Sequence, residues 1–540
     1  MGNLFQQLIE KIAATRFLQF CEEWKILSDC QYGFRKYRSC DTAVANLMYE
    51  IASRQSKVIT YVFLLDLSSA FFCVKKDQLK RLLRKVCKND TYNFFVNLLK
   101  QRSAYLISDG IRSEKIFIPD DGVPQGGGLS PLFFNLIINA MFIFVSRRSI
   151  TFTEAIGIAI QGFADDSILR IFATTEEDRL GLIKEAFDRI LIYAESVGFK
   201  LNPSKTEAFA VGRNKEENGV GATIMTPIGE IELKTTDICI LGLRIDDRLT
   251  FKPQYKHVIQ RMNGVTKDIF ELLEYGTERE VLKFSYSKSC GIYLYGLAIQ
   301  PKWTQKAYSK LQSIVLKHIR IIYGIKWNLE NSWSQNDILR LAKWPPIRIQ
   351  HAKLSLVLLN RIVMGESSDS LFQAVNRHLF SKDGRRFLQI QNPIDEYVND
   401  PLTANSVPEL KITQFQKSRM DPRVSRVFPL TVQAFLDMLP NFIRVMLGTP
   451  EFKSAVNTHF NLSCWHRDEK DCSLCRSMFR VYPDEVNNFN DLLRYAANDL
   501  NTTVQEINNT NEDQINSLLD ISEQATFDLQ DEINQLLYDS

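Results

Sequence analysis

The chain has 540 residues, of which 45% are hydrophobic and 24% charged, so it resembles ordinary globular proteins and has room for two to four domains. Its net charge of +3 is unevenly distributed. Residues 501–540 hold nine acidic residues and no Lys or Arg, which leaves 66 basic and 54 acidic residues in the first 500. A basic body suits a polyanionic partner, and the longest apolar run, the 14 residues of Leu132–Val145, is too short to span a bilayer.

The ten cysteines lie mostly at single, scattered positions. Such usage is typical of a reduced intracellular protein without a disulfide framework. The N-terminus shows no signal-peptide pattern. We therefore expect an intracellular location and no association with a membrane.

The first candidate functional residue is Asp66, which ends the apolar, strand-length run Val58–Leu65. A charged helical stretch follows it. An acidic residue at the end of a buried strand is a common metal ligand, although a single such acid is more often a helix cap or a turn residue.

A glycine-rich segment, Asp121–Pro131, comes next and contains Gln125 and Gly126. Its three consecutive glycines allow the backbone to pass close to a ligand. Ser130 is predicted to be the N-cap, and Pro131 the first residue, of a long apolar helix. A flexible loop before a core helix is the simpler alternative, but a plain linker does not need Pro-Gln-Gly.

The segment Phe163-Ala164-Asp165-Asp166 lies between two apolar runs, 156–160 and 168–172. This pattern predicts a β-hairpin with both carboxylates at its tip. Adjacent carboxylates repel each other, so a chain that keeps them beside buried strands usually binds a cation there. Taken alone, such a pair is more often a solvated turn.

Beyond the hairpin, the pattern predicts an amphipathic helix over Glu176–Val197, a loop that contains Lys205, and a strand over Ile238–Asp246. A lysine in a loop is usually solvated. Further helices are predicted at Gln254–Tyr275, Glu278–Ile299, Thr304–Ile325 and Arg348–Met364.

In this order, these segments resemble the reverse transcriptase of non-LTR retrotransposons, most closely the jockey-type elements, from about residue 5 to about residue 345. The motifs that carry the resemblance are Gln31-Tyr32-Gly33-Phe34-Arg35 with Arg38-Ser39, the strand ending at Asp66, Gly122–Gly126, Phe163–Asp166, Leu201-Asn202 with Lys205-Thr206, and Leu241-Gly242.

The resemblance implies an α+β fold of the right-hand polymerase type, with partial fingers, a palm built on an antiparallel sheet, a helical thumb and a mostly helical C-terminal region. The domains that it implies are partial fingers at 1–60, a palm at 61–250 with an inserted fingers segment at about 75–120, a thumb at 251–345, a C-terminal region at 346–480 and an acidic, disordered tail at 481–540.

The implied activity is RNA-directed DNA synthesis, in which two Mg²⁺ ions support attack by a primer 3′-hydroxyl. Asp66, Asp165 and Asp166 would be the metal ligands and catalytic residues. The implied partners are an RNA template, a DNA primer or target and deoxynucleoside triphosphates, and the implied locations are the nucleus and the cytoplasm.

Other roles follow from position within the motifs. Phe71 would lie under the incoming sugar and select deoxynucleotides, while Gln125 and Gly126 would contact the nucleotide and template–primer. Lys205 would protonate or neutralise the departing pyrophosphate. Arg35 and Arg38 would meet nucleic acid or triphosphate.

The chain departs from the family pattern at two positions, Phe72 and Gly127, and neither is expected to remove the chemistry. The resemblance also leads us to expect that a basic fingers strand and an endonuclease domain are missing before residue 3. Two alternatives stay open: a truncated or decayed copy that binds nucleic acid without synthesis, and a reverse transcriptase of the intron-maturase type.

A Cys/His cluster lies near the C-terminus, at Cys464, His466, Cys472 and Cys475. Cys-x-His and Cys-x₂-Cys are spacings typical of zinc half-sites. The five residues between them are a tight spacing for one four-ligand site, which favours structural or incidental unligated cysteines over a zinc site.

Overall fold

The structure is a computed structural model that describes residues 4–54, 58–68, 70–100, 103–117, 122–123, 127–146, 156–212, 222–325, 335–379, 426–436, 438–439, 441–444 and 446–462. The predicted acidic tail, residues 481–540, lies outside the described residues. Within them the chain is a mixed α+β protein, as predicted.

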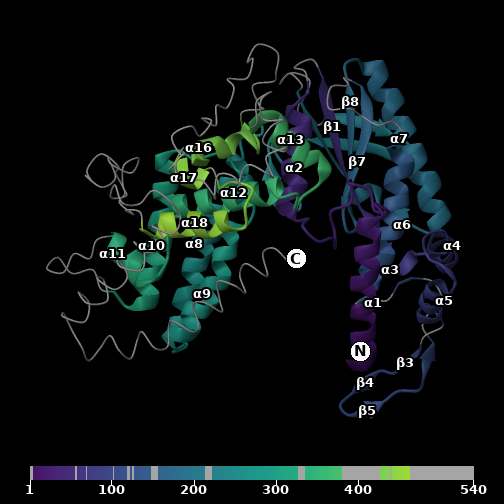
Figure 1. Ribbon diagram of the computed structural model, residues 1–540, viewed down its shortest axis with the longest axis horizontal. Coiled ribbons are helices and arrows are strands. Elements are labelled where there is room, and N and C mark those ends of the chain that lie inside the picture. The colour runs from purple at the N-terminus through teal and green to yellow at the C-terminus, as the bar shows by residue number, and fades with distance from the viewer. Residues whose placement is uncertain are drawn as a thin grey trace, which may run out of the picture.

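A six-stranded sheet forms the centre of the sheet-containing part of the molecule (Figure 1). Its strands are, in spatial order, β11 (Thr223–Thr226), β12 (Gly229–Lys234), β10 (Glu207–Val211), β1 (Ile59–Leu65), β8 (Asp166–Ala173) and β7 (Gly157–Phe163). All neighbouring pairs are antiparallel except β10 and β12. The predicted hairpin around the acidic pair is confirmed, because β7 and β8 pair directly and Ala164-Asp165 connects them.

Strand β1 is central because both of its faces are apolar. Tyr61, Phe63 and Leu65 belong to one hydrophobic core, and Val62 belongs to another on the opposite face. This two-residue alternation follows from the pleat of a strand. The sheet is therefore covered on both sides.

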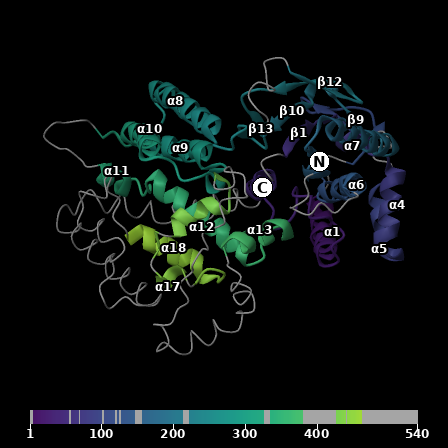
Figure 2. The ribbon, with the colours of Figure 1, turned by 90° about the horizontal axis from the view of Figure 1, so that it is seen from above.

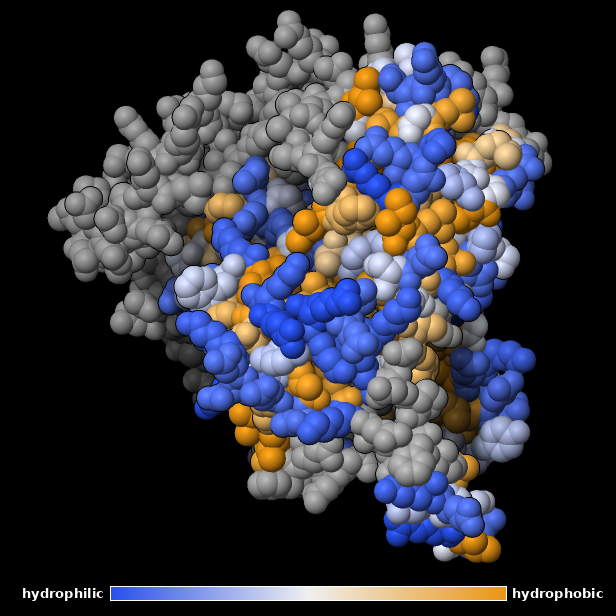
Figure 3. Space-filling view, turned by 90° about the vertical axis from the view of Figure 1, so that its right-hand side faces the viewer, coloured by the Kyte–Doolittle hydropathy of each residue, from blue (hydrophilic) through white to orange (hydrophobic). Residues whose placement is uncertain are grey.

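Two long helices, α6 (Ser130–Val145) and α7 (Glu176–Val197), cover one face of the sheet. Helix α7 has the predicted bounds. Thr175 caps its N-terminus by accepting the Asp178 N–H, and Gly198 ends it in the left-handed conformation at φ 92°. The outer side of this layer mixes hydrophilic and apolar residues (Figure 3).

The predicted start of α6 is wrong by one residue. Leu129 is the N-cap, Ser130 is the first helical residue, and no side chain caps the helix. Pro131 is tolerated in the first turn because an N–H there needs no partner within the helix.

The opposite face carries α2 (Cys40–Ala52) together with helices from the C-terminal part of the chain. Helices α12 (Ile347–Val363), α13 (Asp369–Leu379) and α18 (Glu451–Leu462) share one hydrophobic core with α2. The smaller elements η6 (Leu430–Val432), α16 (Gln433–Leu436) and α17 (Asn441–Arg444) contribute to the same core. In both Figure 1 and Figure 2, α13 lies between the sheet and the other C-terminal helices.

The strand predicted over 238–246 is instead a short hairpin of β13 (Ile238–Ile240) and β14 (Leu243–Ile245). Leu241 and Gly242 form its turn, with positive φ angles of 47° and 77°. The prediction was wrong because this turn lies within a continuous apolar run.

A third core joins α8 (Lys252–Glu274), α9 (Arg279–Leu294), α10 (Gln305–Tyr323) and α11 (Gln335–Leu341). The first three match predicted helices, but α9 ends before the predicted Ile299. Gly296 adopts φ 67° and starts the 3₁₀ turn η2 (Leu297–Ile299). The predicted domain boundaries stay predictions.

The remaining N-terminal elements project from the sheet, with α1 (Leu4–Glu23) as the longest (Figure 1). They also include α3 (Ala70–Cys73), α4 (Lys76–Val86), α5 (Asn89–Leu98) and a ribbon of β3 (Ser103–Ala104), β4 (Ile107–Ser108), β5 (Ile111–Arg112) and β6 (Ile116–Phe117). Within the part of the chain that the structure describes, no helix combines the length and the apolar character needed to cross a membrane.

Candidate active site

The strand register brings the three predicted metal ligands to one end of the sheet. Leu65, the last residue of β1, pairs with Ser167 of β8, and Asp166 pairs with Phe163 across the hairpin. Extending this register by one residue sets Asp66 opposite Asp166. Asp66 and Asp166, 100 positions apart in sequence, thus become neighbours through the strand pairing.

The carboxylates influence one another electrostatically. Burial raises the pKa of Asp166 above its ordinary value, and the charges of Asp165 and Asp66 raise it further. The donor set of three carboxylates suits Mg²⁺, which prefers oxygen ligands. In the described residues, however, no group of three or more His, Cys, Asp or Glu side chains is already arranged to hold a metal ion. The side chains would therefore have to converge around an ion, which would relieve their repulsion.

The segment Phe163–Asp166, hereafter the acidic turn, is in contact with the Gln31–Arg35 motif. The Tyr32 N–H donates to the Gly162 carbonyl at 2.8 Å, and the Gly162 N–H donates to the Cys30 carbonyl at 2.9 Å. A Cβ atom at Gly33 would lie 2.2 Å from the backbone nitrogen of Ala164, so only glycine fits this close approach. Ala164 itself has a left-handed φ of 57°. The motif therefore fixes the backbone beside the acidic pair.

Arg35 and Arg38 form ion pairs within the chain. The Arg35 guanidinium donates to both carboxylate oxygens of Glu22, at 2.7 and 2.6 Å, and Arg38 donates to Asp29 at 2.6 Å. Both guanidinium groups are almost fully buried. Their predicted contact with nucleic acid or triphosphate stays a prediction, and it would require these pairs to rearrange.

The loop that carries Lys205 is attached to Asp66 by backbone contacts. The Asn202 N–H donates to the Asp66 carbonyl at 3.0 Å, and β2 (Leu67–Ser68) pairs with β9 (Lys200–Leu201). Lys205 is exposed at the end of the 3₁₀ turn η1 (Pro203–Lys205). The structure thus sets its loop at the end of the sheet where Asp66 lies.

Phe71 lies in α3 and stacks on Phe134 of α6, with ring centroids 4.2 Å apart. Its carbonyl accepts the Val123 N–H at 2.8 Å, and the carbonyl of Val74 accepts the Gly122 N–H at 2.8 Å. The start of the glycine-rich motif is therefore attached to the segment that carries Phe71. The predicted contact residues Gln125 and Gly126 lie outside the described residues, as do the zinc candidates Cys464, His466, Cys472 and Cys475.

Two supporting residues, Asn135 and Asn139, were not predicted. The Asn135 amide donates to the Gly33 carbonyl at 2.7 Å, and Asn139 accepts the Ser28 N–H at 2.7 Å and donates to the Ile26 carbonyl. A signal was present, because buried amides in an apolar helix need hydrogen-bond partners. Their partners could not be identified without the fold.

This arrangement combines acidic side chains, a nearby loop lysine and closely approaching backbone at one end of a sheet. Carboxylates of this kind can hold divalent cations, and cations beside an alkoxide and a phosphate can promote phosphoryl transfer.

Comparison with known proteins agrees with that chemistry. The model of the family described as reverse transcriptase (RNA-dependent DNA polymerase) matches residues 3–245. A probable RNA-directed DNA polymerase from transposon BS of Drosophila melanogaster is 24% identical over 351 residues, covering 62% of this chain and 36% of that protein. A Pol polyprotein from the type-1 retrotransposable element R2 of Popillia japonica is 27% identical over 233 residues, covering 41% of this chain and 37% of that protein.

A third relative, the Pol polyprotein from the type-2 retrotransposable element R2DM of Drosophila melanogaster, is 33% identical over 156 residues, covering 28% of this chain and 14% of that protein. The matched regions span little more than a third of the length of the first two relatives.

Proposed function

We propose that this chain, whose residues 3–245 form a reverse transcriptase domain of the non-LTR retrotransposon type, is an RNA-directed DNA polymerase that extends a primer on an RNA template. The observation that carries the proposal is the register of β1 and β8, which brings Asp66 to the turn that holds Asp165 and Asp166. These elements lie within the matched residues.

Asp66, Asp165 and Asp166 are the residues that would hold Mg²⁺ in this chain. When bound, the ions would lower the pKa of the primer 3′-hydroxyl and stabilise the charge on the leaving pyrophosphate. The protein would hold the carboxylates in place through the β1–β8 pairing and through the close approach of Gly33 to the turn.

The remaining roles concern the nucleotide. The exposed Lys205 would neutralise or protonate the departing pyrophosphate, since an ammonium group is a compact cationic donor. Phe71, fixed by its stacking on Phe134, would restrict the space beside the 2′-carbon of the sugar. Gln125, Gly126, Arg35 and Arg38 would complete the contacts with nucleotide, template and triphosphate. We also propose a reducing location, in the nucleus and the cytoplasm, because the ten cysteines lie mostly at single, scattered positions.

Primer extension on the purified chain tests the proposal, with poly(rA)–oligo(dT), dTTP and Mg²⁺. We expect labelled dTMP to enter the primer, and we expect EDTA or Asp165→Asn to abolish incorporation. Salt-dependent binding of template–primer without incorporation would contradict synthesis and would favour the alternative of a nucleic-acid-binding copy.

A further inference from the structure

The N-terminus of α13 is held by an acidic side chain 340 positions earlier in the chain. The Asp29 carboxylate accepts the Asp369 N–H at 3.1 Å, the Ser370 N–H at 3.0 Å and the Ser370 hydroxyl at 3.1 Å. The first N–H groups of a helix have no partner within the helix and favour a negative charge. Asp29 therefore caps α13 from a distant part of the chain.

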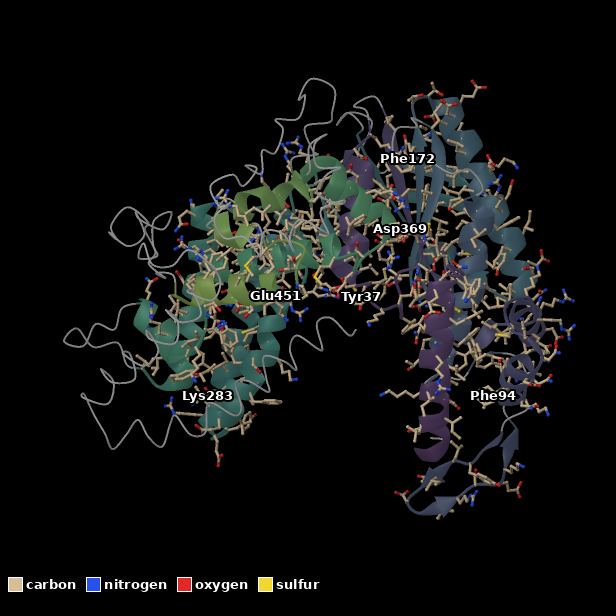
Figure 4. All side chains as sticks on the ribbon, in the orientation of Figure 1. Tyr37, Phe94, Phe172, Lys283, Asp369 and Glu451 are labelled. Atoms are coloured by element: carbon tan, nitrogen blue, oxygen red, sulfur yellow. The ribbon has the colours of Figure 1, made fainter. Side chains whose placement is uncertain are left out.

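A second bond joins the same two segments. The hydroxyl of buried Tyr32 donates to the Ser368 hydroxyl oxygen at 3.0 Å, and the Leu371 N–H also donates to that oxygen, at 3.2 Å. Figure 4 shows Asp369, the first residue of α13, between the C-terminal helices and the sheet. Two different side chains of the 28–33 loop thus bond to one helix end.

The charge of Asp29 is maintained by its surroundings. Burial alone would raise its pKa, but the Arg38 guanidinium and the backbone N–H groups of Ser370 and Asp369 hold the pKa below its ordinary value. The contact is therefore charge-assisted, and such hydrogen bonds are stronger than neutral ones.

The 28–33 loop contacts both α13 and the acidic turn, and so connects the two. On its other side, Cys30 and Tyr32 bond to both backbone groups of Gly162, and Gly33 lies against Ala164. The loop contains no helix, and its β-pairing is limited to an isolated bridge between Gln31 and Gly162. Its position therefore depends on the side chains around it. Arg35 and Arg38 hold it from the following segment, α6 holds it through Asn135 and Asn139, and α13 holds it through Ser368 and Ser370.

We infer that Ser368, Asp369 and Ser370 are positioning residues for the acidic turn, acting through Asp29 and Tyr32. These residues follow the matched region 3–245 by more than a hundred positions, so the inference assigns part of the site's geometry to the C-terminal helices. The expected effect on catalysis rests on the proposed function. The expected effect on the rigidity of the acidic turn is independent of it.

The test is the double variant Ser368→Ala/Ser370→Ala in the full chain, which leaves the reverse transcriptase domain unaltered. Hydrogen exchange followed by mass spectrometry should show about tenfold faster exchange in peptides covering 157–166 and little change in α8–α10. Binding of Mn²⁺, measured by electron paramagnetic resonance, should weaken about fivefold, and kcat should fall about tenfold with the KM for template–primer within about twofold of the original value.

The matched control is Gln373→Ala, an exposed change on the same helix that should leave all four measurements unaltered. Exchange at 157–166 equal to that of the original chain, or faster exchange spread equally over α8–α10, would overturn the inference. Faster exchange confined to 157–166 in a chain whose unaltered form neither binds Mn²⁺ nor extends primers would support the inference and overturn the proposed function.

Discussion

The acidic residues at the end of the sheet repel one another, and we propose that they lower the stability of the chain while they serve the metal-dependent chemistry. Burial raises the pKa of Asp166, and so do the charges of Asp165 and Asp66, which shows that these groups repel one another without a cation. Asp165→Asn should therefore lower primer extension by about a thousandfold or more, because the variant lacks one of the proposed metal ligands. The free energy of unfolding measured without Mg²⁺ should stay the same or rise slightly, because one repulsive charge is lost.

Primer extension and urea unfolding of the same preparation check this prediction. Full activity in the variant would exclude Asp165 as a ligand. A large loss of stability would instead show that its carboxylate is a structural hydrogen-bond acceptor.

Phe71 allows a prediction about sugar selection. Its ring is fixed by stacking on Phe134 at 4.2 Å, so a smaller side chain would leave space that the protein does not readily refill. Phe71→Val should raise the incorporation of ribonucleotides relative to deoxynucleotides by about tenfold or more, because loss of a steric block removes discrimination. Competing rGTP and dGTP on a poly(rC) template measure the ratio.

A useful control is Phe94→Val, a change of the same type at an exposed ring of α5. The ratio should not change there. Unchanged discrimination in Phe71→Val would show that another residue excludes the 2′-hydroxyl.

Among the elements, those with a strong local pattern were predicted well. Helix α7 has its predicted bounds because its capping Thr175, its apolar spacing and its terminal Gly198 all lie within one segment. The β13–β14 hairpin was missed because Leu241-Gly242 turns within apolar sequence. The contact of Asp29 with α13 could not be predicted, since no periodicity links residues 340 positions apart.

The contact between the Gln31–Arg35 motif and the acidic turn predicts a strong effect for a very small change. Gly33→Ala would place a methyl group 2.2 Å from the Ala164 nitrogen, so the loop or the turn must move. We expect the free energy of unfolding to fall by about 1–3 kcal/mol, as for other overpacked sites. Extension should fall further than stability alone explains, because the displaced backbone carries Asp165.

Gly181→Ala is the matched control, since Gly181 lies inside α7 with no atom within 4 Å of the added methyl group. It should stabilise the chain by about 0.5–1 kcal/mol, because alanine favours helix. If the two variants had equal activity and stability, the loop would not be in contact with the turn.

At the scale of the whole molecule, three hydrophobic cores are joined by shared elements. One core contains α2, strands of the central sheet and the C-terminal helices, while the α8–α11 bundle has its own. Polar groups are buried where the helices meet. His318 contacts Thr266 of α8 at 2.7 Å and Tyr286 of α9 at 3.3 Å, and His351 contacts Tyr308 of α10 at 2.8 Å. Protonation of His318 or His351 should therefore weaken the contacts between these helices.

The last prediction follows from three buried histidines. Burial lowers the pKa of His318 to about 4, of His351 to about 3 and of His459 to about 4. The unfolded chain titrates near pH 6.5, so between pH 6.5 and about 4 it binds protons that the folded chain does not. Stability is therefore intact above pH 6.5 and falls as the pH drops, by about 1.4 kcal/mol per pH unit for each histidine.

Urea unfolding at several pH values between 7 and 4.5 measures this slope for the chain and for His318→Gln. In the variant, the free energy of unfolding should change with pH less steeply, by the contribution of one histidine. The comparison of slopes is valid even if the substitution lowers stability at every pH. His257→Gln, at a half-buried histidine of α8, should reduce the slope less. An equal slope in the original chain and in His318→Gln would show that His318 is accessible to protons in the folded state, and the helix junction it occupies would then not be closed to solvent.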